Sequence, residues 1–199
     1  MLKIDCRKNR FKKFVIIVSG FIQFIFTNQI YSQNIDWDKV SYGVSGQTLL
    51  LTGDFKENWK NSFGPGIILK YSIKPSLYIE GQMAFASISR KNKDDKTIPD
   101  IYLINMPLGL KWYFLNINQT RIFIYSGIEN NTFVFRGDAA AIQRDNKIES
   151  EFGAFVSAGI NPGFAIKPSL EFYSAFQTIF SYPENINVYF IGINVYFNE

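Results

Sequence analysis

The sequence contains no histidine and one cysteine, Cys6. The lack of histidine excludes a Ser-His-Asp triad, a histidine metal ligand and a histidine general base. One cysteine cannot form an intramolecular disulfide. We also find no glycine-rich phosphate loop after a strand and no zinc-ligand spacing. We therefore predict no catalytic residue, no cofactor and no metal site, and we expect a protein that is not an enzyme.

An excess of positive charge is also lacking over most of the chain. Six of the 21 basic residues lie in residues 1–33, together with one of the 17 acidic residues, so the remainder is close to neutral. The formal charge of +4 therefore reflects the N-terminal segment. It gives no reason to expect nucleic-acid binding.

The N-terminal segment has the pattern of an export signal. Residues 3–13 are basic, residues 14–26 are apolar, and residues 27–33 are polar. This order is typical of a secretory signal peptide, and the apolar run is short for a helix that must span about 30 Å of hydrocarbon. We predict a signal peptide over residues 1–33, with an uncleaved N-terminal anchor as the alternative. Cleavage at this point would leave the mature chain without cysteine.

Long apolar runs are absent beyond residue 33, and the hydrophobic pattern there has a period of two. Over residues 102–114, one row reads Tyr, Ile, Met, Leu, Leu, Trp, Phe, and the alternate row reads Leu, Asn, Pro, Gly, Lys, Tyr. Such alternation separates two faces of a β-strand, whereas a helix would mix them. Pro107 cannot donate a ladder hydrogen bond, so we expect a bulge or local break there.

The alternating pattern occurs eight times, and the connectors between the eight segments alternate between long and short along the chain. We predict short connectors after the even-numbered strands and long connectors after the odd-numbered ones. The short ones are residues 74–76, 115–120 and 167–169, and the long ones are 54–62, 90–100, 130–150 and 181–187. An even strand number with short turns at one end favours a closed barrel that crosses a membrane. The predicted fold is an all-β, eight-stranded antiparallel up-and-down transmembrane β-barrel over residues 34–199.

The two faces of each strand can be assigned from charge. A lysine or arginine facing the bilayer centre costs about 2–4 kcal/mol, so rows with charged side chains must face the lumen. The predicted lumen polar network is Lys70, Glu80, Lys111, Arg121, Glu129, Glu151 and Glu171. The predicted lipid-facing set is Ile104, Leu108, Leu110, Trp112, Ile191 and Ile193. We interpret the lumen charges as interior filling; a gated ion path or proton relay is the alternative.

Two internal segments and the last strand resemble a known family. INMPLGLKWYF and RIFIYSGIENN are similar to segments of small outer-membrane β-barrel proteins of Gram-negative bacteria, of the porin-family/PorT-like and OmpA/OmpX types. Gly192, Val195 and Phe197 match the family's terminal Gly-x-x-apolar-x-aromatic assembly signal. Two features depart from it, because Phe190 stands where a polar residue is expected and two residues follow the aromatic.

The resemblance implies an exported outer-membrane protein whose partners are outer-membrane lipid, the barrel-assembly machinery and envelope or secretion proteins. We expect a structural or surface-interaction role, with the long loops as the contact surface and no catalysis. One alternative is a transport or secretion-assembly component, either a narrow channel or a PorT-like partner. Another is a soluble exported barrel of the lipocalin type that binds a ligand.

Overall fold

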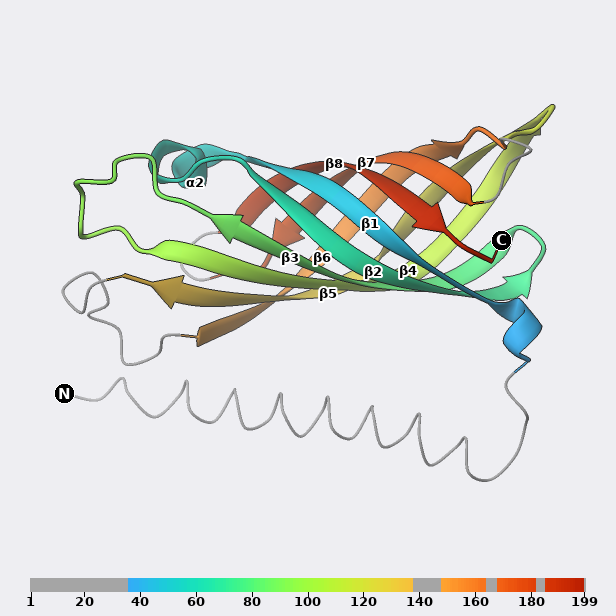
Figure 1. Cartoon of the computed structure of the whole chain (residues 1–199), viewed down its shortest axis with the longest axis horizontal. Coiled ribbons are helices and arrows are strands. Elements are labelled where there is room, and N and C mark those ends of the chain that lie inside the picture. Colours follow the sequence, from blue (N-terminus) through green and yellow to red (C-terminus); the bar gives the residue numbers. More distant parts are fainter. Residues whose placement is uncertain (1–35, 138–147, 164–167, 182–184, 199) are drawn as a thin grey trace, which may run out of the picture. The chain divides into compact units, whose positions relative to one another are not determined.

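Eight strands form one closed antiparallel barrel in which each strand pairs with its neighbours in sequence and β8 closes on β1 (Figure 1). The computed structural model describes residues 36–137, 148–163, 168–181 and 185–198. The strands are β1 Val40–Leu51, β2 Ser62–Lys74, β3 Leu77–Ile88, β4 Asp100–Ile117, β5 Thr120–Arg136, β6 Ile148–Asn161, β7 Ser169–Ile179 and β8 Ile186–Tyr196. The predicted eight-stranded antiparallel barrel is confirmed. The predicted signal peptide lies outside the described residues.

The alternating sequence pattern becomes an alternation of burial. On β4, Leu108, Leu110 and Trp112 are 41%, 51% and 50% exposed, whereas Lys111 and Tyr113 are buried. Successive side chains of a strand point to opposite faces, and in a closed barrel those faces are the lumen and the outside. Along this part of β4, the large apolar side chains therefore point outward and the charged one is enclosed.

The connections after β2 and β4 are short turns, as expected, whereas the connection after β6 is not, and the predicted bounds of the last two are wrong. The turn between β4 and β5 contains only residues 118–119, because both strands continue past the predicted turn, 115–120. Asn118 takes the left-handed conformation there, with φ of 56°, which asparagine tolerates better than most residues. The connection between β6 and β7 spans residues 162–168 and is longer than predicted, because β6 ends at Asn161.

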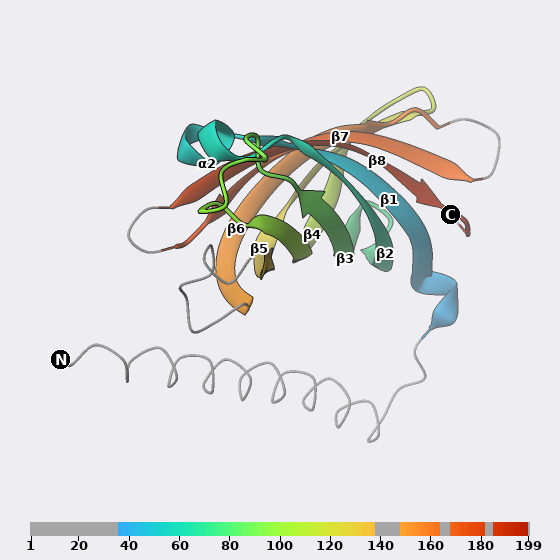
Figure 2. The same ribbon diagram turned by 60° about the vertical axis from the view of Figure 1, so that its left-hand side comes forward.

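The connections after β1, β3 and β5 are the longest, and their end of the barrel is here called the long-loop end; the predicted long connector 181–187 is wrong in this respect, because the connection after β7 spans residues 180–185 and is shorter than the one after β6. The connection after β1 contains a short helix, α2 Gly53–Asn58, which the sequence pattern did not predict and which lies at the barrel rim (Figure 2). Gly53 begins this helix with φ of 56°, a backbone conformation that favours glycine. The predicted loop 130–150 is shorter than expected, since β5 continues to Arg136 and β6 begins at Ile148. Within the described part of the chain, no helix is long and apolar enough to cross a membrane.

Pro107 interrupts one ladder of β4, as expected. Between β3 and β4, pairing runs to Gly81 with Leu108 and resumes at Ala84 with Asn105 in the same register. On the other side, Pro107 pairs with Glu129 of β5 without a shift. The proline therefore causes a local break toward β3 and no bulge.

Candidate functional site

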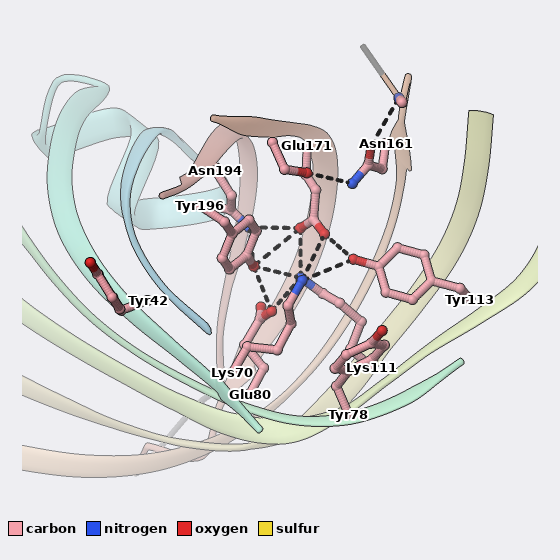
Figure 3. Close-up of polar contacts among 12 residues, drawn as sticks. Tyr42, Lys70, Tyr78, Glu80, Lys111, Tyr113, Asn161, Glu171, Asn194 and Tyr196 are labelled. Atoms are coloured by element: carbon pink, nitrogen blue, oxygen red, sulfur yellow. Dashed lines mark hydrogen bonds and ion pairs between the residues drawn. The ribbon is translucent and has the colours of Figure 1, made fainter. Parts of the chain in front are cut away.

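A four-member ion cluster lies inside the barrel, toward the short-turn end. Lys111 Nζ is 2.5 Å from Glu80 Oε2 and 2.7 Å from Glu171 Oε2. Lys70 Nζ is 3.6 Å from Glu171 Oε1. All four residues are at most 1% exposed. Figure 3 shows the side chains converging from β2, β3, β4 and β7, so the cluster connects strands from opposite walls of the barrel.

Hydroxyl and amide groups complete the shell of this ion cluster. The Tyr196 hydroxyl donates to Glu80 Oε2 at 2.6 Å, and the Tyr113 hydroxyl donates to Glu171 Oε1. Asn194 Nδ2 donates to Glu171 Oε2 at 3.3 Å. Lys70 Nζ lies 3.8 Å from the centre of the Tyr196 ring, close enough for a cation–π contact. Because each carboxylate accepts several charged or neutral donors, the cluster meets the requirement for burying charge.

The other predicted lumen residues lie apart from these four. Arg121, half-buried near the short-turn end, lies with its guanidinium 4.5 Å from the centre of the Tyr113 ring. Glu151 is half-buried on β6, where it pairs across the ladder with Asn131. Glu129 is 3% exposed and lies in a separate layer of amide side chains. The structure thus brings together Lys70, Glu80, Lys111 and Glu171 as one directly bonded group.

The amide layer lies further toward the long-loop end. Asn105 Nδ2 donates to Glu129 Oε2 at 3.2 Å and to Asn131 Oδ1 at 2.8 Å, and Gln177 Nε2 donates to the same Asn131 oxygen at 2.9 Å. Gln82 donates to Ser45 at 2.8 Å. A cavity with about 30 Å³ of space for water lies between this layer and the ion cluster. The eight-stranded interior is therefore filled by side chains, with room for about two or three water molecules.

The interior becomes apolar at the long-loop end. Ten buried residues form one cluster there: Leu49, Leu51, Ala86, Ile88, Ile101, Leu103, Phe133, Ile179, Val188 and Phe190. Phe55 and Trp59 pack against it, with their rings stacked 4.7 Å apart. Trp59 Nε1 also donates to the carbonyl of Pro99 at 2.8 Å, so the α2 segment is bonded to the next long loop.

The predicted lipid-facing residues all lie on the outer face. Leu108, Leu110, Trp112 and Ile191 are exposed, whereas Ile104 and Ile193 are half-buried. Exposed aromatic side chains lie toward both ends of the strands. They include Tyr42, Tyr71, Trp112, Phe114 and Phe197 toward the short-turn end, and Phe63, Phe85, Tyr102, Phe152 and Tyr189 toward the long-loop end.

The three residues predicted as an assembly signal lie on both faces of the last strand. Val195 and Phe197 are on the outer face, and Phe197 is exposed. Gly192 faces the lumen, where a Cβ atom would lie 2.5 Å from the Tyr173 hydroxyl oxygen. That hydroxyl donates to Gln47 Oε1 at 3.0 Å. Gly192 therefore has a packing role, since it leaves room for the Tyr173 ring.

We expect Gly192→Val to lower the free energy of unfolding by about 1–3 kcal/mol, because the added methyl groups must displace Tyr173. Urea unfolding of barrel refolded in detergent measures the change without any assembly machinery. Gly192→Val combined with Tyr173→Ala should recover part of the loss. If the free energy of unfolding of Gly192→Val equals that of the wild type, Gly192 has no packing role, and only its role in the assembly signal would remain.

The sequence pattern placed the tyrosine and amide partners in the inward rows but did not identify them as partners. The partners come from strands that are far apart in the sequence; Lys111 and Glu171, for example, are separated by 60 residues. The ion cluster contains two lysines and two glutamates, so its formal charges balance. Among the described residues, no group of three His, Cys, Asp or Glu side chains is placed to hold a metal ion.

The barrel is similar to solved outer-membrane structures at low sequence identity. No protein-family model matches the sequence, and no curated protein sequence matches it. Neisserial surface protein A aligns with a TM-score of 0.56 at 10% identity, covering 80% of this chain and 96% of that protein. The Yersinia pestis protein Ail in a phospholipid nanodisc aligns with a TM-score of 0.48 at 13% identity, covering 79% and 99%. The N-terminal barrel domain of Pseudomonas aeruginosa OprF has a TM-score of 0.47 at 11% identity, covering 79% and 97%. The first of these likenesses, at a TM-score above 0.5, supports the eight-stranded barrel fold.

Proposed function

We propose that this chain is an integral outer-membrane β-barrel protein of the porin-family/PorT-like, OmpA/OmpX-type group, with a structural or surface-interaction role and no catalysis. One observation carries the proposal: the outer face is apolar and the charges are inside. Lys111 is fully buried between Leu110 and Trp112, which are about half exposed. A barrel in water has no reason to expose such a band, whereas hydrocarbon stabilises it.

The aromatic residues toward both strand ends support a membrane position. Tyr and Trp side chains favour the two membrane–water interfaces. In the proposed orientation the short turns face the periplasm and the long-loop end faces outward, as in outer-membrane barrels. The long loops would then be the contact surface for envelope or external partners. Outer-membrane lipid and the barrel-assembly machinery are the partners that membrane insertion requires.

The two alternative functions receive less support from the interior. A lipocalin-like soluble barrel needs an apolar ligand cavity, but the central interior holds an ion cluster and an amide layer. A narrow channel needs a continuous path, and the described interior contains buried side chains at every level. A secretion-assembly role uses the outside of the barrel or its loops, and it is the second candidate function for a membrane barrel.

We expect the mature protein to be recovered with outer membranes and to show heat-modifiable migration, because a closed barrel resists unfolding by detergent until it is boiled. Unboiled and boiled samples of the same membrane fraction should migrate differently on a denaturing gel. Extraction at high pH should leave the protein in the membrane pellet. Recovery as a soluble periplasmic protein would contradict the proposal.

A further inference from the structure

The first residues of β1 extend past the end of β8 at the short-turn end of the barrel. The regular pairing of β1 with β8 ends at Gly43, which lies opposite Tyr196. On its other side, β1 stays paired with β2 as far as Val40, which lies opposite Tyr71. Residues 40–42 are therefore a place where the β1–β8 seam could end in an open sheet edge, with unpaired backbone groups.

Three hydrogen bonds continue the seam past this point. Phe197 N donates to the Tyr42 carbonyl at 3.0 Å, which adds one backbone bond beyond the regular pairing. Asn198 supplies the other two with its side chain: Oδ1 accepts from Tyr42 N at 2.9 Å, and Nδ2 donates to the Val40 carbonyl at 2.7 Å. One side-chain amide thus bonds both a donor and an acceptor on the same edge of β1.

An asparagine side chain carries both groups that this edge requires. In a regular antiparallel ladder, the acceptor and the donor that meet two such edge groups come from the backbone of the partner strand. The asparagine amide offers one carbonyl oxygen and one NH2 group, whereas an aspartate would offer acceptors alone and a leucine neither. The amide of Asn198 therefore takes the place of a piece of partner strand.

The outer face of the seam supports the same arrangement. The rings of Tyr42 and Phe197 lie 6.0 Å apart, so the terminal aromatic side chain packs against the first strand. Figures 1 and 2 both show the C-terminal end of the chain beside the start of β1. Asn198 directly follows Phe197, and its position past the aromatic, which departs from the terminal assembly signal, brings its amide to the edge of β1.

We propose that Asn198 is a closure latch, whose side-chain amide completes the β1–β8 seam at the short-turn end in place of strand backbone. Without this latch, the start of β1 would be an open edge, and local separation of β1 from β8 would begin there. The inference is independent of the proposed membrane location, because it concerns only how the barrel closes.

Hydrogen exchange of the Tyr42 amide, followed by NMR on the protein refolded in detergent micelles, tests the latch. Asn198→Leu keeps most of the side-chain volume but removes both hydrogen bonds, so we expect the Tyr42 amide to exchange about tenfold faster than in the wild type. Asn198→Asp keeps an acceptor for Tyr42 N, so its rate should lie between the two. Asn116→Leu, the same change at an exposed position of β4 near the same end of the barrel, is the matched control and should leave the rate unchanged.

A measurement on the wild-type protein needs no variant. After correction for intrinsic rates, the Tyr42 amide should exchange at least about tenfold more slowly than an exposed loop amide such as that of Lys93. Equal rates for these two amides would overturn the proposal, because Tyr42 N would then lack a lasting partner. A wild-type rate that persists in Asn198→Leu would also overturn it, because another acceptor would then protect Tyr42.

Discussion

Lys111→Met should lower the free energy of unfolding by about 3–5 kcal/mol, the range expected when one member of a buried ion cluster is removed. Lys111 Nζ is the cation within 2.7 Å of both Glu80 and Glu171. Without it, Lys70 alone must balance two buried carboxylates. Methionine keeps most of the side-chain volume, so the loss reports charge rather than a cavity. Urea unfolding of barrel refolded in phospholipid vesicles, followed by tryptophan fluorescence, measures the change.

Restoring neutrality tests whether charge is the cause. Lys111→Met combined with Glu80→Gln leaves the Lys70–Glu171 pair. The amide oxygen introduced by Glu80→Gln can still accept from the Tyr196 hydroxyl, which lies 2.6 Å from Glu80 Oε2 in the wild type. We expect the double variant to be more stable than Lys111→Met alone. Lys93→Met, at an exposed position in a long loop, should change stability by less than about 0.5 kcal/mol. A double variant weaker than the single one would show that packing around Lys111, and not charge balance, holds the cluster.

The position of Lys111 shows what sequence alternation can predict. Trp112 and Leu110 flank it, so a period of two places Lys111 opposite them, on the side that cannot face hydrocarbon. The same argument assigned Glu80 and Glu171 to the lumen, where both are buried. The pattern fixes the face of each side chain, because a shift of the strand by one residue would move every side chain to the other face.

Which lumen residues meet cannot be predicted in this way, because the answer depends on barrel closure and register. Glu171 on β7 reaches Lys111 on β4 across the lumen, whereas Glu129 on β5 does not join them. The α2 helix escaped prediction for a different reason. Its six residues are too few to show helical periodicity, and their placement depends on the packing of Phe55 and Trp59 against the apolar interior.

Leu110→Arg should prevent stable insertion into a bilayer, because an arginine facing the membrane centre costs about 2–4 kcal/mol. Leu110 is 51% exposed near the middle of the β4 outer face. Ile117→Arg is the matched control: Ile117 is 54% exposed on the same strand but lies at its short-turn end, where an arginine can reach water at a cost of about 0–1 kcal/mol.

The comparison separates a membrane barrel from a soluble one. In a membrane barrel, Leu110→Arg is exported but accumulates outside the membrane fraction, and it refolds poorly into vesicles, whereas Ile117→Arg inserts like the wild type. In a soluble barrel, both outer positions already face water, so arginine at either one should be tolerated and should improve solubility. Equal insertion of the two variants would therefore contradict the membrane proposal, even though the barrel itself would remain. The position dependence of the effect, rather than its mere presence, is what identifies hydrocarbon as the medium around the outer face.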